Sequence, residues 1–384
     1  MTAFLTAAEA AARLGVSRQT LYAYVSRGLI EAHPTADPRV RAYAAEAVAR
    51  LAASRHRGRR PREVARAALD WGLPVMETAV TLIRDGRLYY RGTDALVLSE
   101  TATLEEVAAL LWALPQSAAF GSAAPEIDGR GAEPRGGDLL GAFAVATEDD
   151  PTAPWQQDPA RLAAGSGALV RLLGACITGR APDAAPLHLS CAEAWSLDPA
   201  GAEGVRRALV LCADHELNAS GFTARCVASA GASLRAAVIG GLAALSGSRH
   251  GGMTARVEAL WDALDGPDPA SSLRRQLAGR EDLPGFGHPL YPAGDPRAAA
   301  LLAPLLAEDP RLRAVAAAAQ ELTGARPALD FALVALRRRL ALPRGSAFGL
   351  FALGRSVGWI AQGLEQRQAG GLIRPRSVYV GPEP

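Results

Sequence analysis

Residues 285–292 read Gly-Phe-Gly-His-Pro-Leu-Tyr-Pro, and two further histidines lie in similar surroundings, in Ala-Asp-His-Glu-Leu-Asn-Ala-Ser (213–220) and in Arg-His-Gly-Gly (249–252). These segments hold three of the six histidines of the 384-residue chain. A single histidine is more often a core or surface residue than a catalytic one. Glycine and asparagine, however, let backbone approach a bound molecule closely, so the three segments are candidate walls of a ligand site.

Charged residues after these histidines extend the pattern. They occur in Gly-Asp-Pro-Arg (294–297), Ala-Leu-Asp-Phe (328–331), Gly-Arg-Ser-Val-Gly-Trp (354–359) and Arg-Pro-Arg (374–376). Taken in order, this series of histidines, arginines and one aspartate resembles the citrate synthase family. The resemblance runs from about Leu73 to the C-terminus, and it includes Tyr90-Arg91-Gly92 and Thr103-Leu104-Glu105-Glu106-Val107-Ala108 near its start.

The resemblance implies the condensation of acetyl-CoA, oxaloacetate and water to citrate and CoA, a step of the tricarboxylic acid cycle. A weakly acidic proton beside a thioester carbonyl must be removed, which needs a positioned carboxylate base and a donor to the enol oxygen. By resemblance, Asp330 is the base and His250 the donor. His288 would polarise the ketone, and His215 would help to orient it.

Oxaloacetate carries two carboxylates, and the forked guanidinium of arginine matches a carboxylate better than a point charge does. By resemblance, Arg297, Arg355 and Arg374 bind these carboxylates. The family's counterpart of Arg374 comes from the other subunit, so a homodimer with shared active sites is implied.

The resemblance also suggests where CoA passes close to backbone: at Gly251 and Gly252, and at the turn formed by Phe286 and Gly287. Two departures bear on this part of the site. Met253-Thr254 follows the glycine pair where Ala-Asn is more usual, which could alter the acyl group that fits. Pro289-Leu290 follows His288 where Arg-Val is common, which removes a charge that could meet CoA phosphates.

The expected fold is mainly α-helical: a large and a small citrate synthase domain, preceded by a winged helix-turn-helix domain. The small domain closes over substrate and thereby excludes water. We expect the helix-turn-helix domain over 1–54, an arginine-rich linker over 55–64, the large domain over 65–253, the small domain over 254–352 and a return to the large domain over 353–384. A hairpin is predicted to turn at Asp85-Gly86.

The N-terminal segment predicts two short helices. Thr6-Ala7-Ala8-Glu9 is a capping box for a helix ending at Gly15, and Ser17 can cap a second helix that carries Tyr24 on its surface and ends at Gly28. With a third helix to about Ser54, the segment resembles MerR-type regulators. That resemblance implies DNA contacts from Ser17, Arg18, Gln19, Thr20 and Tyr22 in the second helix and from Arg39 and Arg41 in the wing.

Charge is unevenly divided along the chain. All 41 basic residues are arginine; residues 1–62 hold eleven of them against four acidic residues, a net charge of +7, which leaves −5 for the remainder. A positively charged segment favours contacts with the phosphates of DNA. A helical appendage that does not bind DNA, followed by a solvated hinge, would have the same charge pattern.

Composition excludes several classes of protein. No apolar stretch reaches the roughly 18 residues of a membrane helix, and no secretory signal is evident, so a soluble cytoplasmic protein is expected. The four cysteines occur singly, which argues against a zinc site or disulfides and favours buried thiols. Without a GxGxxG or Walker loop, nucleotide-dependent chemistry is not expected. We expect no bound metal and no cofactor. Acyl-CoA is expected to be a substrate.

Two alternatives to the citrate synthase activity stay open. A 2-methylcitrate synthase using propionyl-CoA differs by one methylene, worth only about 1 to 3 kcal/mol in an apolar pocket. A DNA-binding regulator could instead use the citrate synthase body to sense oxaloacetate or an acyl-CoA.

Overall fold

The computed structural model describes residues 4–26, 30–35, 41–49, 76–121, 138–146, 149–264, 268–278, 282–377 and 379–382. The chain divides into two compact units, Met1–Glu77 with Pro375–Pro384, and Thr78–Arg374. We call residues 4–49 the head and Thr78–Arg374 the body. The expected linker over 55–64 and the expected start of the large domain at 65 lie outside the described residues.

The head begins with strand β1 (Phe4–Thr6), followed by helix α1 (Ala7–Leu14). The predicted capping box is present: Glu9 N donates to Thr6 Oγ1, and Thr6 N donates to the Glu9 carboxylate at 2.8 Å. Gly15 ends α1 at a φ of 63°, a conformation that glycine adopts without strain. Ser17 Oγ accepts from Thr20 N at the start of α2 (Arg18–Ser26), as predicted. The predicted end at Gly28 lies outside the described residues.

A small sheet completes the head. Strands β2 (His33–Pro34) and β3 (Arg41–Ala44) pair antiparallel, and β1 adds to the other side of β3. Residues 45–49 begin the expected third helix. Side chains from these elements form a separate apolar core: Ala10, Ala11, Leu14, Leu21, Ile30, Tyr43 and Val48. The winged helix-turn-helix prediction is therefore confirmed for the described part of the head.

The body starts with the predicted hairpin. Strands β4 (Thr81–Arg84) and β5 (Arg87–Tyr90) turn at Asp85 and Gly86, both with positive φ, and β6 (Thr93–Asp94) pairs with β5. Two positive φ angles are typical of a tight hairpin turn. The buried hydroxyl of Tyr90 donates to the Val210 carbonyl at 3.0 Å, which ties the hairpin to the helices.

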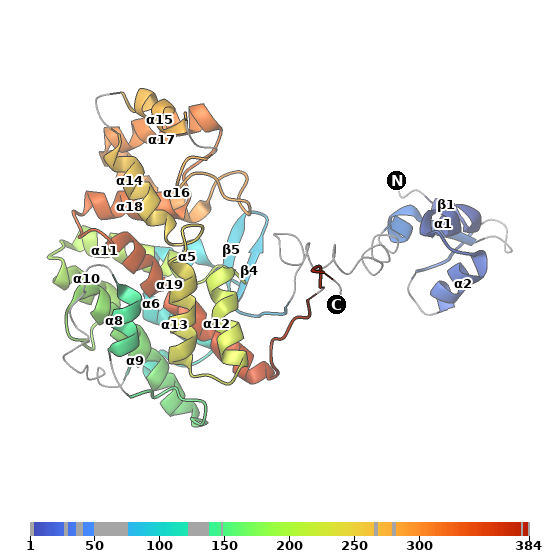
Figure 1. Cartoon of the computed structure of the whole chain (residues 1–384), viewed down its shortest axis with the longest axis horizontal. Coiled ribbons are helices and arrows are strands. Elements are labelled where there is room, and N and C mark those ends of the chain that lie inside the picture. Colours follow the sequence, from blue (N-terminus) through green and yellow to red (C-terminus); the bar gives the residue numbers. More distant parts are fainter. Residues whose placement is uncertain are drawn as a thin grey trace. The chain divides into compact units, whose positions relative to one another are not determined.

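Helices make up most of the rest of the body (Figure 1). The first ten are α5 (Ala95–Thr101), α6 (Leu104–Trp112), α7 (Gln116–Phe120), α8 (Leu139–Val145), α9 (Pro159–Thr178), α10 (Leu187–Ala194), α11 (Pro199–Cys212), α12 (Ala219–Ser229), α13 (Leu234–Leu245) and α14 (Met253–Asp262). The last five are α15 (Pro269–Leu277), α16 (Pro296–Glu308), α17 (Pro310–Thr323), α18 (Leu329–Arg339) and α19 (Ser346–Ala369).

Asp-Pro pairs start several of these helices. The aspartate accepts a backbone hydrogen bond and the proline occupies the first helical position in α9, α11, α15, α16 and α17. Proline suits this position because its missing N–H would have no partner there. Helices α14 to α18 form one end of the body in Figure 1. The expected small-domain boundaries, 254 and 352, stay a prediction.

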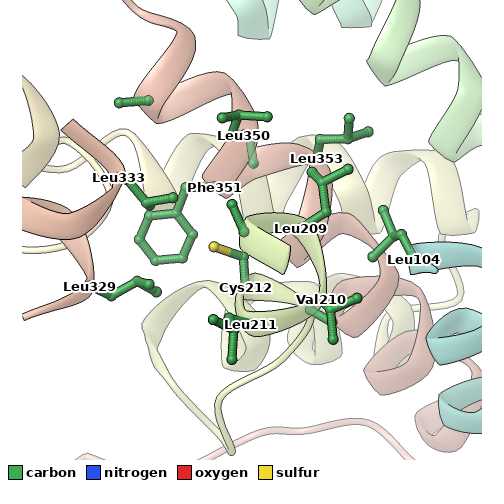
Figure 2. Packing of buried hydrophobic residues seen from close by; sticks show 14 of the residues in the cluster. Leu104, Leu209, Val210, Leu211, Cys212, Leu329, Leu333, Leu350, Phe351 and Leu353 are labelled. Carbon is green, nitrogen blue, oxygen red and sulfur yellow. The ribbon is translucent and has the colours of Figure 1, made fainter. Parts of the chain in front are cut away.

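Three helices meet at the centre of the body. Figure 2 shows apolar side chains packed together from α11 (Leu209, Val210, Leu211, Cys212), α18 (Leu329, Leu333) and α19 (Leu350, Phe351, Leu353). Burying each such side chain contributes roughly 1.5 to 3 kcal/mol, so this contact fixes the three helices relative to one another. Residues after the end of α11, at the start of α18 and along α19 are thereby brought close together.

Two sequence expectations need adjustment. Helix α9 is long and apolar enough to cross a membrane by length and composition, but 67% of its 18-residue apolar window is buried inside the body, as in a core helix. The sequence shows no uninterrupted apolar stretch of that length here, because α9 contains arginine and polar residues among its apolar ones. Cys176, Cys191 and Cys212 are buried as expected, whereas Cys226, in α12, is only half-buried.

Candidate active site

His215 lies three residues beyond α11. The ring is buried, and its Nε2 is 2.9 Å from the hydroxyl of Tyr291. Glu216, the next residue, has a φ of 53°, a strained conformation for a side chain of this kind. Asn218 then caps α12 by accepting from the Ser220 and Gly221 amides. This sharp turn between two helices holds the His215 ring in the interior.

His250 lies in the tight turn between α13 and α14, where its amide donates to the Gly247 carbonyl. Its Nε2 is 2.8 Å from Ser220 Oγ and 3.3 Å from Asn218 Oδ1. Ser220 Oγ also donates to Asn218 Oδ1 at 2.7 Å. Because that proton is already directed at Asn218, Ser220 accepts from Nε2–H of His250. Nδ1 of a neutral His250 would then carry no proton.

His288 follows a turn that is tied to the segment preceding Asp330. Gly287 N donates to the Arg326 carbonyl and Ala328 N to the Gly285 carbonyl, both at 2.8 Å. The ring of Phe286 lies 4.7 Å from that of Phe331. The His288 ring packs edge-on against His215, 5.2 Å between centroids, and Nδ1 of His288 accepts from Leu290 N. The loop thus positions His288 relative to both His215 and α18.

Asp330 is the second residue of α18, near the positive end of the helix dipole. Its Oδ1 is buried without a hydrogen bond, and burial raises the pKa of Asp330 to about 7 against the opposing pull of Arg297. A carboxyl group with a pKa in this range takes up and releases a proton near neutral pH. That property fits a general base.

Arg297 is buried in the first turn of α16, where Asp295 holds it. Nε and Nη2 of Arg297 donate to the two oxygens of Asp295 at 3.0 and 2.8 Å. Asp295 also accepts from Leu329 N, the residue before Asp330. The pair therefore links the arginine to the start of the helix that carries the proposed base, and Nη1 of Arg297 is not used by Asp295.

Arg355 projects from α19 and is only 1% exposed. Its Nε donates to the Cys212 carbonyl at 2.8 Å, but Nη1 and Nη2 are buried with no hydrogen-bond partner in the described part of the chain. The guanidinium lies 4.9 Å above the ring of Phe351, one turn earlier in α19. The buried Asp214 balances part of its charge, but the two unused donors suit a carboxylate, because a buried donor without a hydrogen bond is costly.

Arg374 does not join this cluster within one chain. It is exposed in the segment after α19, and no hydrogen bond, ion pair or ring contact connects it to another residue among those the structure describes. Six of the seven sequence-predicted catalytic and dicarboxylate-binding residues are thus buried or half-buried parts of the body interior, and the seventh is on its surface.

The three histidines are electrically neutral at pH 7. Burial lowers the pKa of His250 to about 3 and that of His288 to about 4, with Arg297 or Arg355 adding to the effect. Burial, with both arginines, also lowers the pKa of His215 well below its ordinary value. Neutral imidazoles beside two guanidinium groups form a site that favours an anionic ligand while the histidines act as hydrogen-bonding groups.

The chain's own conformation explains why the positions expected to border CoA are glycines. A Cβ at Gly251 would lie 2.7 Å from Leu245 Cγ, and one at Gly252 2.3 Å from the Ser246 carbonyl oxygen, so the turn itself requires both glycines. Gly287 has a φ of 78°, which strains other residues. The contacts of Gly251, Gly252, Phe286 and Gly287 with CoA stay predictions, and the need for glycine is explained by the chain's own packing.

The head presents much of the expected DNA-contacting set. Ser17, Arg18, Gln19, Tyr22 and Arg41 are exposed, and Tyr22 is 53% exposed despite its size. Thr20 is half-buried and hydrogen-bonds Ser17. The expected surface position of Tyr24 is wrong, because this residue packs partly against the head's core. Arg39 lies outside the described residues.

Known proteins match both parts of the chain. A model of the citrate synthase C-terminal domain matches residues 139–376, and a helix-turn-helix domain model matches residues 4–56. The helical fold and this arrangement of histidines, arginines and aspartate define the class, and the chain belongs to the citrate synthase family, with an added helix-turn-helix domain.

Individual relatives agree with this assignment. The putative citrate synthase 2 of Mycobacterium tuberculosis is 39% identical over 209 residues, 49% of this chain and 53% of the relative. The 2-methylcitrate synthase of the same species is 34% identical over 189 residues, 46% and 48% of the two chains. The chain thus spans about half the length of these curated relatives. The crystal structure of citrate synthase from Thermotoga maritima superposes with a TM-score of 0.65 at 25% identity, over 81% of this chain and 94% of that one.

Sequence reasoning missed the residues that support the site. Ser220 and Asn218 hold His250, Asp295 holds Arg297, and Tyr291 contacts His215. Each of them lies inside one of the segments 213–220, 285–292 and 294–297, so the signal was available. Serine, asparagine and aspartate at helix starts, however, are more often read as caps, a role that Asn218 and Asp295 also fulfil.

Proposed function

We propose that the protein catalyses the condensation of acetyl-CoA with oxaloacetate and water to citrate and CoA. The observation that carries this proposal is the buried Arg355, whose two unpaired nitrogens lie in an interior that also contains three neutral histidines and a carboxyl group with a pKa of about 7. Family membership supports the reaction type. The acyl group becomes an alkyl group on transfer, as in other enzymes of this class.

The first step is removal of a methyl proton from acetyl-CoA. Asp330 takes this proton, and His250 holds the enol oxygen that forms. The imidazole can donate its one proton to that oxygen in two ways when the thioester binds. Either Nε2–H exchanges Ser220 for the enol oxygen, or the Ser220 hydroxyl turns to donate to Nε2 and the imidazole carries its proton on Nδ1. Because the pKa of His250 is lowered to about 3, the imidazole is neutral, and a neutral N–H suits a weakly acidic enol since neither group then has to carry a full charge.

The second step is attack of the enol carbon on the ketone carbon of oxaloacetate. Arg355 and Arg297 bind its carboxylates, His215 helps to fix its orientation, and His288 polarises the ketone oxygen. Water then hydrolyses the citryl thioester, which releases CoA. Asp295 balances the charge of the buried Arg297 and uses its Nε and Nη2, which leaves Nη1 for a substrate carboxylate.

Release of the CoA thiol by the purified full-length protein tests the activity. Release that requires oxaloacetate, and that Asp330→Asn lacks, would support the proposal. No release with acetyl-CoA or propionyl-CoA would overturn it. Running both thioesters side by side also separates citrate synthase from 2-methylcitrate synthase, the activity named for one of the relatives.

The proposal includes a homodimer in which Arg374 completes the partner's active site. Its support is the exposure of Arg374 and its separation from the other six residues within one chain. Sedimentation velocity with the full chain tests the dimer; a monomer at micromolar concentration that still turns over would contradict it.

DNA binding by the head is the second candidate function. Three features favour DNA binding. The head combines a two-helix motif with a winged sheet, its second helix exposes Arg18, Gln19 and Tyr22, and residues 1–62 carry a net charge of +7. Fluorescence anisotropy with promoter and random DNA at several salt concentrations tests it. Equal affinity for both DNAs at physiological salt, or no effect of Arg18→Ala, would contradict a specific regulator.

A further inference from the structure

Tyr291 contacts several residues of the proposed oxaloacetate site. It lies three residues after His288, and two turns hold its backbone: Tyr291 N donates to the His288 carbonyl, and Gly294 N donates to the Tyr291 carbonyl, both at 2.9 Å. The residue is 2% exposed. A large polar side chain that is almost fully buried needs a partner for its hydroxyl group.

One side chain contacts three of the proposed oxaloacetate-binding residues. The hydroxyl is 2.9 Å from Nε2 of His215, the ring centroid is 5.0 Å from that of His288, and the guanidinium carbon of Arg297 lies 5.4 Å from the ring centroid. The Tyr291 ring thus packs against His288 and Arg297, while its hydroxyl makes a hydrogen bond with His215.

The direction of that hydrogen bond decides what His215 can bind. A neutral imidazole carries one proton, either on Nδ1 or on Nε2. If Nε2 carried it and donated to the tyrosine, Nδ1 would be a bare acceptor and would repel the oxygens of a dicarboxylate. If the hydroxyl donates to Nε2, Nδ1 carries the proton and becomes a donor. No described residue hydrogen-bonds Nδ1, so that donor remains for a bound molecule.

The protonation states of both groups agree with the second arrangement. Burial raises the pKa of Tyr291 to about 12, so the hydroxyl keeps its proton at neutral pH. The pKa of His215 is lowered well below its ordinary value by burial and by the nearby Arg297 and Arg355, so the imidazole is neutral.

We propose that Tyr291 is a positioning residue whose hydroxyl donates to Nε2 of His215 and thereby keeps on Nδ1 the proton that binds oxaloacetate. This inference rests on the proposed function, since it concerns the acceptor substrate of that reaction. Tyr291 acts through His215 and takes no part in proton transfer to the substrate.

Nitrogen NMR of ¹⁵N-histidine-labelled full-length protein tests the tautomer without any need for activity. The chain has six histidines, and His215→Gln identifies the signals of His215. An unprotonated Nε2 and a protonated Nδ1 in the wild type are expected, with Nε2 gaining a proton in Tyr291→Phe. A protonated Nε2 in the wild type would overturn the proposal.

Oxaloacetate binding supplies the second readout. Tyr291→Phe keeps the ring contacts with His288 and Arg297 and removes only the hydroxyl. By calorimetry the Kd for oxaloacetate should rise about fivefold to tenfold, the usual loss for one hydrogen bond. In turnover assays the KM for oxaloacetate should rise by more than kcat falls, whereas a loss of folded protein would lower kcat alone. Tyr89→Phe, on β5, is the matched control.

These outcomes separate the two proposals. An unchanged Kd in Tyr291→Phe would refute the role of Tyr291 even in a fully active enzyme. Failure to turn over acyl-CoA, with the expected NMR and calorimetric results, would refute the condensation reaction but leave Tyr291 as part of a dicarboxylate-binding site.

Discussion

The hydroxyl of Ser220 lies 2.8 Å from Nε2 of His250 and donates to Oδ1 of Asn218 at 2.7 Å. Asn218, which caps α12, therefore also fixes, through Ser220, the proposed enol donor His250, which lies 32 residues further along the chain. Helix start and active site are built from the same hydrogen bonds, so the orientation of His250 depends on the correct packing of α12 against the turn after α13.

Ser220→Ala should lower kcat by up to about tenfold, because a lost neutral hydrogen bond costs about 0.5 to 1.5 kcal/mol and here frees the His250 ring to rotate. The KM for oxaloacetate should change little, since Ser220 contacts none of the proposed carboxylate-binding residues in the described structure. Steady-state kinetics check both values. Thr223→Ala, on the same helix and with a hydroxyl that donates to the Ala219 carbonyl, provides a control, and an equal loss in that variant would rule out a specific role for Ser220.

Asp330→Asn should stabilise the fold while it abolishes turnover. The folded-state pKa of Asp330, about 7, exceeds its ordinary value of 3.8. The neutral carboxyl group therefore contributes its full stability to the fold at acid pH, and this contribution is lost as the pH rises from 3.8 through 7. Asparagine cannot ionise and avoids this loss, which amounts to at most about 4 kcal/mol. Thermal unfolding at pH 5 and pH 8 tests this.

The Tm difference between Asp330→Asn and the wild type should grow from pH 5 to pH 8. A difference that is the same at both values would show that Asp330 is ionised throughout, and the proposed poised base would be wrong.

Asp295→Asn should destabilise the body by about 3 to 5 kcal/mol, because it leaves the guanidinium of Arg297 buried without its counter-ion. The KM for oxaloacetate should rise as well, since Arg297 loses the carboxylate that orients it. Asp309→Asn is a matched control: Asp309 also precedes a proline and caps a helix, α17, without a buried arginine partner. Comparable losses of stability in the two variants would contradict the special role of the Asp295–Arg297 pair.

Arg374→Ala and Asp330→Asn should complement each other when mixed. If Arg374 completes the partner's site, a heterodimer of the two variants has one intact site, and random exchange should restore about a quarter of wild-type activity. Each variant alone should be nearly inactive. Mixed and unmixed samples are compared after subunit exchange, and a mixture no more active than its components would place Arg374 in its own subunit's site.

The fold, and most residues of the candidate site, could be predicted because the deciding residues cluster in short motifs. The turn at Asp85-Gly86, the capping box at Thr6 and the sequence of site motifs from His215 to Arg355 are local signals that packing does not override. The supporting contacts are of another kind: Tyr291 reaches His215 across 76 residues, and Asp295 reaches Leu329 across 34. Such pairs depend on tertiary packing. For the same reason, the sequence alone could not show that the turn itself requires Gly251 and Gly252.

The formation of citrate from ¹³C-labelled acetyl-CoA and oxaloacetate is the most direct test of the central claim, because it reports the new carbon–carbon bond and not mere thioester hydrolysis. The account predicts labelled citrate and an equal amount of CoA from the purified full-length protein, and neither from Asp330→Asn. CoA release without labelled citrate, or labelled citrate formed equally fast by Asp330→Asn, would contradict it.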